Sequence, residues 1–470
     1  MKLAGFSLAY FLVLLDTTVL TIALPDLRAS LGGSVAGQQW AVNAYTVAFA
    51  ACLLTGGAVA DRYGAARVFR VGVAAFGVLS VLSAAAPHLG ALVVLRALLG
   101  VAGSLCLGGS LGLLAELHPS PAARARATGA WAAITGVALA AGPLLGGLLV
   151  GLYGWRAVFL LNPPLALVSL LAVRGLRSPR GARRIDWYAQ ALTCAFLGLL
   201  AEALTDSSLP AALLSLAALA ALAALVLTHH HTSAVATTRS SIPGPATTGS
   251  AIAGPATSGS ATAGAVGSGS AEPAGRTRGS VVPRGLVAAT WPELLAGAVA
   301  NFAFSGALFV LTLLLQDTRH LTPMQTGLAF LPLTIPMVVN PVLTGRIVAR
   351  HGARPPILAG LALLAAGLAG AALAEGPPLG WLIVIGCGLS LCFPALMAGM
   401  VASAPPGTAG TAGGVLNAAR QVGATLGVAV LGGLTAGARP LLVAAILTTA
   451  TFVAYGAVGF RRRSGRPITE

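Results

Sequence analysis

The chain is a succession of apolar stretches, each about twenty residues long and separated from the next by a short polar connection. Of its 470 residues, 56% are hydrophobic and 9% are charged, whereas soluble chains carry about 25% charged residues. A bilayer accepts only backbone whose polar groups are satisfied within a helix or a closed barrel, and the stretches lack strand alternation. The pattern excludes a water-soluble globular enzyme and predicts an all-α membrane protein.

Fourteen stretches fit this description. The weakest, 189–205, can be removed only together with 209–228, because removing it alone would reverse the orientation of everything that follows. We therefore expect fourteen spans, with twelve as the alternative. The stretches run over 6–25, 40–60, 68–86, 91–115, 126–150, 155–173, 189–205, 209–228, 289–315, 323–347, 355–374, 378–402, 411–435 and 440–460.

Basic residues are divided unevenly between the two sides that these spans define. With the N-terminus inside, the outer loops hold only Arg28, Arg156, Arg319 and Arg439 of the 28 Lys and Arg residues. Cytoplasmic loops of membrane proteins collect Lys and Arg. The distribution predicts that both termini are cytoplasmic. It also explains the net charge of +16 by the orientation of the chain in a lipid bilayer, so that no nucleic-acid partner is needed.

An internal repeat and a low-complexity segment predict the domain organisation. The sequence GAVADRYGAAR at 57–67 is echoed by GRIVARHGAR at 345–354, and transporters are commonly built from repeated halves. Residues 229–285 consist mainly of Ala, Gly, Ser, Thr and Pro, which cannot bury enough apolar surface to order a chain. We expect an N-terminal six-helix bundle at 1–174, two additional transmembrane helices at 175–228, a disordered cytoplasmic linker at 229–285 and a C-terminal six-helix bundle at 286–470.

Two of the twelve acidic residues, Asp16 and Glu202, lie well inside apolar stretches. An intramembrane charge costs about 2.5–3.5 kcal/mol or more, so an acid there is a functional candidate. Asp16 is near the bilayer midplane, about 15 Å along its helix. Burial favours the protonated carboxyl and a nearby cation opposes this effect. We expect Asp16 to carry a proton; the alternative is a carboxylate that only packs between helices.

Arg96 is the main intramembrane cation of the first half, and such a cation needs a partner. Asp16 is the nearest acid in depth, so we predict an exchangeable ion pair, with a bond to backbone carbonyls as the alternative. Glu202 belongs to the added pair of helices, away from a central cavity. Arg420 and Gln421 are polar positions of the second half that either line the cavity or cap the cytoplasmic end.

Other chemistries find little support in the sequence. The five cysteines lie in apolar spans without a CxxC pair and are interpreted as packing residues. Three histidines at 229–231 begin the linker, where we interpret them as a solvated loop rather than a metal site. A phosphate-binding loop with GK[ST] is absent from the sequence, since Lys2 is its only lysine. We expect no metal, no catalytic residue and no cofactor other than protons as the coupling ion.

Several motifs in order along the chain resemble one family. The loop GAVADRYGAAR resembles the signature between the second and third spans of the major facilitator superfamily, and the further motifs resemble its drug:proton antiporter family with fourteen spans. These motifs are LDTTVLTIALP at 15–25, LVVLRALLGVAG at 92–103, GVALAAGPLLGG at 136–147, WRAVFLLNPP at 155–164, LLLQDTRHLTPMQTGLAFLP at 313–332 and GGVLNAARQVGATLGVAV at 413–430.

The resemblance implies a major facilitator fold, with the two extra helices between the bundles, and it implies roles for three groups of residues. The first loop would latch the bundles, through Gly57, Asp61, Arg62, Gly64 and Arg67. The fifth span would carry the antiporter motif, with Gly142, Pro143, Gly146 and Gly147. Polar positions expected to line the cavity are Thr17, Thr21, Asn301, Gln316, Asn417, Arg420 and Gln421.

Together, the intramembrane acid and the resemblance predict a function. We expect a proton-coupled antiporter that exports small hydrophobic drugs or antibiotics by alternating access, as a monomer in the bacterial cytoplasmic (inner) membrane, and not an enzyme. Export of an endogenous metabolite is one alternative. A membrane scaffold or sensor that transports nothing on the same fold is the other.

Overall fold

A computed structural model describes most of the chain as helices. The described residues are 2–117, 121–179, 187–205, 285–374, 378–405, 409–434 and 439–463, with four single positions between 213 and 220. Within these ranges every regular element is helical, as predicted. The stretch 209–228, apart from those positions, and the linker 229–284 lie outside the described residues.

In the described part of the first half, eight helices follow the predicted apolar stretches. They are α1 (Lys2–Leu31), α2 (Val35–Tyr63), α3 (Ala65–Ala84), α4 (Leu89–Leu117), α5 (Pro121–Tyr153), α6 (Arg156–Leu160), α7 (Asn162–Ala172) and α8 (Trp187–Thr205). The predicted stretch 155–173 is divided at Leu161, and α7 restarts at Asn162 with proline in its first turn, where the missing N–H is tolerated.

The second half follows the remaining stretches in the same way. Its elements are α10 (Leu286–Leu313), the π-helical turn η1 (Leu314–Thr318), α11 (Pro323–Ala329), α12 (Leu331–Val339), α13 (Pro341–His351), α14 (Arg354–Leu373), α15 (Leu379–Ser403), α16 (Ala409–Gly433) and α17 (Arg439–Arg463). The predicted stretch 323–347 is divided among α11, α12 and α13, each with proline at its start, and α12 and α13 meet at a bend of 47°.

The number of spans is lower than predicted in the part of the chain that the structure describes. Eight helices are long and apolar enough to cross a membrane, or up to eleven if each bent pair is one span. The protein is therefore a multi-pass membrane protein, and the count of fourteen is not confirmed. The domain boundaries stay predictions.

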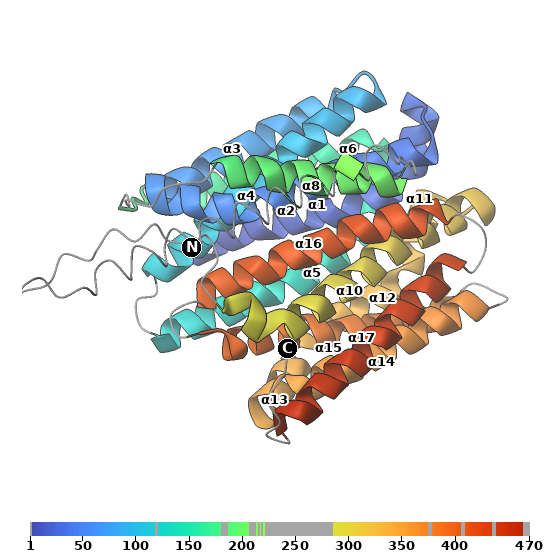
Figure 1. Ribbon diagram of the computed structural model, residues 1–470. Coiled ribbons are helices and arrows are strands. Elements are labelled where there is room, and N and C mark those ends of the chain that lie inside the picture. The colour runs from blue at the N-terminus through green and yellow to red at the C-terminus, as the bar shows by residue number, and fades with distance from the viewer. Residues whose placement is uncertain are drawn as a thin grey trace, which may run out of the picture.

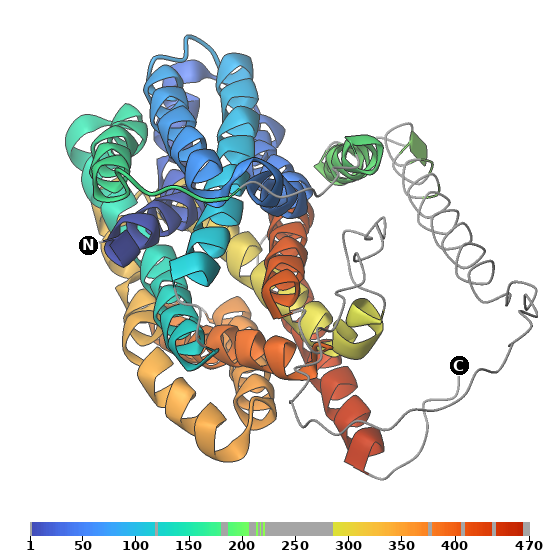
Figure 2. The same ribbon diagram turned by 90° about the vertical axis from the view of Figure 1, so that its left-hand side faces the viewer.

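The helices pack in two groups that meet along the molecule. In the first half, α1 packs on α5 and α7, and α2 and α3 pack on α4; in the second half, α10 packs on α16, and α14 packs on α15 and α17. Figure 2 shows the blue helices of the first group above the orange and red helices of the second. Helix α8 lies at the side, against α2 and α16.

The internal repeat has the same backbone in both halves. Helix α2 ends before Gly64 and α13 ends before Gly352, with φ values of 93° and 81°. The N–H of each glycine donates to the carbonyl oxygen four residues back, at 2.9 Å in both cases. A positive φ is readily adopted by glycine alone, so the shared Gly of the two sequences terminates both helices in the same way.

Candidate functional site

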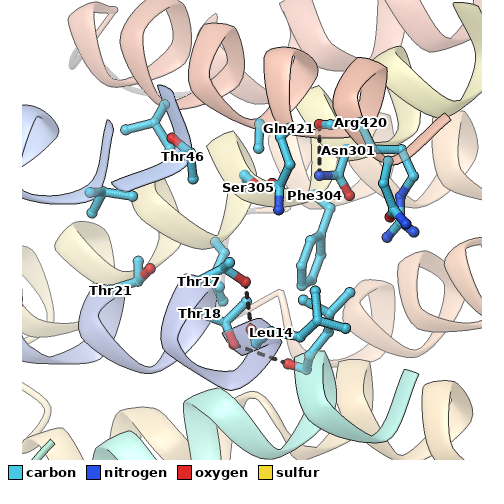
Figure 3. Close-up of a pocket in the computed structure, with 16 residues that line it drawn as sticks. Leu14, Thr17, Thr18, Thr21, Thr46, Asn301, Phe304, Ser305, Arg420 and Gln421 are labelled. Atoms are coloured by element: carbon cyan, nitrogen blue, oxygen red, sulfur yellow. Dashed lines mark hydrogen bonds between the residues drawn. The ribbon is translucent and has the colours of Figure 1, made fainter. Parts of the chain in front are cut away.

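A small polar cavity lies between the two halves, at the level of the middle of α1, α2, α10 and α16 (Figure 3). It leaves about 20 Å³ of space, room for a single water molecule. Ligand sites for drug-sized molecules measure roughly 300–1,000 Å³, so the cavity is closed down in this conformation. It is lined by Leu14, Thr17, Thr18, Thr21, Val42, Thr46, Leu139, Asn301, Phe304, Ser305, Leu308, Asn417, Arg420, Gln421, Ala424 and Val428.

Most of the polar residues expected in the cavity lie in its wall. Thr17 and Thr21 come from α1, Asn301 comes from α10, and α16 contributes three further residues, which are Asn417, Arg420 and Gln421. Gln316 is placed elsewhere: its Nε2 donates to the carbonyl oxygen of Ile22 at 3.0 Å. The π-helical turn η1 carries this side chain onto α1, so it joins the two halves and does not line the cavity.

The polar side chains of the second half are fixed to one another. Asn301 Nδ2 donates to the carbonyl oxygen of Arg420 at 2.8 Å, which joins α10 to α16. The guanidinium of Arg420 lies 4.1 Å from the ring centroid of Phe393 on α15. Arg420 is 7% exposed, so of its two predicted locations, the cavity and the cytoplasmic cap, the structure places it in the cavity.

Asp16 and Arg96 form an ion pair inside the first half, between Oδ2 and Nη1. Both side chains are completely buried. Arg96 Nε donates to the carbonyl oxygen of Ala41 at 3.0 Å, and its guanidinium lies 4.5 Å from the ring centroid of Tyr45. The pair predicted from depth alone is therefore present, and it joins α1 to α4 beside α2.

The Asp16 carboxylate points away from the cavity. The next residue, Thr17, lines the cavity, and successive residues of an α-helix are rotated by about 100° around its axis. The direct contact with a central chamber that the sequence suggests is therefore absent in this conformation. Any influence of Asp16 on the cavity has to act through the position of α1.

Asn162 completes the environment of Asp16 and was missed by the sequence analysis. Its Nδ2 lies 3.3 Å from Asp16 Oδ1 and 3.0 Å from Ser80 Oγ, and the side chain is 1% exposed. An amide in an apolar stretch directly before two prolines is the signal that could have found it. The side chain connects α7 to α1 through the Asp16 carboxylate and to α3 through the Ser80 hydroxyl.

The glycines of the predicted antiporter motif allow α5 to approach helices of both halves. A Cβ atom at Gly142 would overlap the hydroxyl of Thr18 on α1, and one at Gly147 would lie 2.6 Å from the carbonyl oxygen of Pro323 on α11. Gly146 lies against Val19, and Pro143 lies against Gly327 through its carbonyl oxygen. Small residues permit such close helix contact, so the motif lies at the junction of the two halves.

Further contacts between the halves lie toward the same end of the bundle, opposite the end marked N in Figure 1. The side-chain amide of Gln39 donates to the carbonyl oxygen of Val428 at 3.3 Å. The carboxylate of Asp317 lies 3.5 Å from the guanidinium of Arg28. Together with the contacts of Gly147 and Gln316, these interactions close this end of the cavity.

The predicted gating loop packs on the first half. Gly64 lies against the carbonyl oxygen of Ser178, and the backbone N–H of Ala66 donates to the hydroxyl of Ser178 at 3.0 Å. The guanidinium of Arg62 lies 5.4 Å from the ring centroid of Tyr63. Side chains that are exposed on this loop are those of Asp61, Arg62 and Arg67. Latching of the two bundles by this loop stays a prediction.

Two acids outside the first bundle lie away from the cavity, as the sequence suggests for Glu202. Glu202 is half-buried on α8 and does not line the cavity. Glu293, which falls near the end of its apolar stretch, is 6% exposed. Its Oε1 lies 3.4 Å from both Ser403 Oγ and Tyr455 Oη, because α10 begins at Leu286 and is covered there by α15 and α17.

Comparisons with known proteins agree with this architecture. The Major Facilitator Superfamily model matches residues 6–428. The tetracenomycin C resistance and export protein of Streptomyces glaucescens is 32% identical over 448 residues, covering 92% of this chain and 75% of that protein. A puromycin resistance protein of Streptomyces alboniger is 32% identical over 450 residues, covering 93% and 82%.

Solved structures show the same fold at low sequence identity. A peptide transporter in complex with sulfate superimposes with a TM-score of 0.65 at 14% identity, covering 98% of this chain and 94% of that one. A bacterial homologue of the human lysosomal transporter Spinster gives a TM-score of 0.64 at 14% identity, covering 100% and 98%. With its family model spanning most of the sequence and relatives at 32% identity along nearly its whole length, the chain belongs to the Major Facilitator Superfamily.

Proposed function

We propose that this protein is a proton-coupled antiporter that exports small hydrophobic drugs or antibiotics across the bacterial inner membrane. Its relatives include a tetracenomycin C resistance and export protein, a puromycin resistance protein and a methylenomycin A resistance protein, which supports a drug efflux transporter. Members of this superfamily are transporters rather than enzymes. The observation that carries the coupling proposal is the buried Asp16–Arg96 pair, which lies one residue from the cavity wall.

In this mechanism, Asp16 acts through α1. With the carboxylate charged, the ion pair and the Asn162 amide hold α1 on α4 and α7. A proton on Asp16 removes the negative charge, and the attraction to Arg96 is lost. Helix α1 is then free to shift, and Thr17 and Thr21 on its other face move with it. Substrate binding in the cavity and protonation of Asp16 are linked in this way, although they take place at different positions.

The proposed orientation determines which side of the membrane the closed end of the cavity faces. With both termini in the cytoplasm, the end closed by Gly147, Gln39 and Gln316 is the outer end. Transport requires these contacts to separate, so that the cavity opens outward and Asp16 takes up a proton. Return to the described arrangement releases the proton inward.

The proton gradient is sufficient for this task. One charge crossing about 100 mV is worth about 2.3 kcal/mol, and a difference of about one pH unit adds about 1.4 kcal/mol. One proton per cycle can sustain a gradient of several hundred-fold for a neutral drug. We propose that the protein does this as a monomer.

The test compares efflux of a fluorescent drug from cells with and without an uncoupler. Wild-type efflux is expected to stop when the proton gradient collapses. Asp16→Asn is expected to export drug with no dependence on the gradient, or not at all. Glu202→Gln, which neutralises an acid outside the cavity wall, is the matched control and should behave as wild type. Gradient-dependent export by Asp16→Asn would refute the coupling role.

A further inference from the structure

The two buried arginines in the part of the chain that the structure describes differ in their partners. Arg96 in the first half is neutralised by Asp16. Arg420 in the second half is 7% exposed and lines the cavity. Within the part of the chain that the structure describes, Arg420 takes part in no ion pair, its buried Nε has no hydrogen-bond partner, and its guanidinium lies 4.1 Å from the ring centroid of Phe393.

An unneutralised guanidinium at this depth is costly. Removing one partner of a buried pair strongly destabilises a protein, because it leaves an uncompensated buried charge, and intramembrane charges mark substrate or ion pathways. The ring of Phe393 compensates only part of this cost, since a cation–π contact is weaker than pairing with an opposite charge. The position of Arg420 in the cavity wall therefore indicates that its counter-charge arrives from within the cavity.

Two amides beside Arg420 have unused hydrogen-bonding capacity as well. Among the described residues, Asn417 Nδ2 and Asn301 Oδ1 are buried without hydrogen-bond partners, and both residues line the same cavity. The Asn301 side chain also holds the backbone of Arg420, so these groups stay together when the halves separate. They form a head-group subsite that belongs to the second half alone (Figure 3).

The rest of the cavity wall combines uncharged polar side chains with apolar ones, and the apolar ones determine the other end of the ligand. Leu14, Leu139, Phe304 and Leu308 face the cavity. We infer that the preferred substrates are amphipathic molecules with an apolar ring body and one anionic oxygen group, such as a sulfonate, carboxylate, phenolate or enolate, which pairs with Arg420. This inference rests on the proposed export function and specifies the substrate class of the same site.

The test uses two dyes that share one ring system. The anionic probe is 8-anilinonaphthalene-1-sulfonate, and the uncharged probe is N-phenyl-1-naphthylamine. Binding is measured on the full-length protein in nanodiscs of zwitterionic lipid, after subtracting partition into empty nanodiscs. The wild type is expected to prefer the sulfonate by about tenfold or more, which corresponds to about 1.4 kcal/mol. Arg420→Gln should abolish this preference, and Arg420→Lys should retain part of it.

The controls separate the subsite from general charge and from folding. Arg439 is exposed at the start of α17, so Arg439→Gln removes an equal charge outside the cavity and should leave the preference intact. Thermal melting verifies that each variant is folded. If Arg420→Gln unfolds, the partial preference for the sulfonate expected in Arg420→Lys is the test. A wild-type protein without a preference, or an equal preference in Arg420→Gln, overturns the inference.

Two further experiments are needed. The first distinguishes a simple anion from an amphipathic one, and the second distinguishes failure of this inference from failure of the export proposal. If inorganic sulfate displaces the dye as effectively as naphthalene sulfonate does, the subsite holds simple anions and the substrate assignment is wrong. In everted vesicles, transport of the neutral dye without the anionic one contradicts this inference and leaves drug export standing. Transport of neither dye, combined with sulfonate binding lost in Arg420→Gln, supports the subsite and contradicts the export function.

Discussion

Gly147 of α5 lies so close to Pro323 of α11 that a Cβ atom on the glycine would lie 2.6 Å from the proline carbonyl oxygen. The two residues belong to different halves, and the contact is reinforced by Gly327, whose own Cβ would lie 2.7 Å from the Pro143 carbonyl oxygen. Two backbones meet here with no side chain between them. The closure of this end of the cavity thus depends on the glycines of α5 and α11.

Substituting Gly147 by valine is expected to open this end. Overpacking costs about 1–3 kcal/mol, which shifts the population of the closed state by roughly tenfold or more. A cysteine introduced at Thr425, which lies beneath the closure and is hydrogen-bonded to Thr46, should then react faster with a membrane-impermeant maleimide in a background without the native cysteines. Gly198→Val is the matched control, because a Cβ there meets nothing within 4 Å. Equal labelling of both variants would contradict this account.

Neutralising Asp16 alone is expected to destabilise the protein, because it leaves Arg96 buried without its partner. The loss should be about 3–5 kcal/mol. Asp16→Asn combined with Arg96→Gln should recover part of the lost stability, while gradient-dependent efflux stays absent. Melting temperatures of the purified single and double variants measure the first effect. Additive losses in the double variant would show that the two side chains are not coupled.

The amide of Asn162 is expected to position the carboxylate of Asp16. Asn162→Ala removes a hydrogen bond to a charged group, which is worth about 1.5–3 kcal/mol, and should lower both the melting temperature and the rate of gradient-driven efflux. Ser80→Ala removes only the other partner of the amide and should have the smaller effect on efflux. Equal efflux in the two alanine variants would rule out a positioning role.

Glu293 is expected to stabilise the second half without taking part in coupling. Tyr455→Phe and Ser403→Ala each remove one hydroxyl that contacts Glu293 Oε1, and each should cost about 1 kcal/mol. Glu293→Ala should destabilise the protein more, because it leaves a buried cavity and removes the carboxylate from both hydroxyls at once. Thermal melting measures these losses, and efflux with and without an uncoupler measures coupling. A Glu293 variant that is stable but uncoupled would reassign this acid to transport.

Features that depend on local hydropathy were predictable. The helices follow the apolar stretches, and the Asp16–Arg96 pair follows from two charges at the same depth in a region with few others. The position of Gln316 was predicted wrongly, because η1 alters the rotation of the chain after α10. The burial of Glu293 could not be predicted from its place near the start of the stretch 289–315, because it depends on the packing of α15 and α17 on α10.

The amino-acid sequence alone determined that the chain crosses a membrane as helices and that it carries a rare acid and rare arginines at lipid depth, because both properties depend on residue type and position along the chain. The tertiary structure decided which way these groups face. A helix rotates about 100° per residue, so the packing of α1 directs Asp16 into the first half and Thr17 into the cavity. The packing of α16 leaves Arg420 facing the cavity, where no acid of the described chain neutralises it.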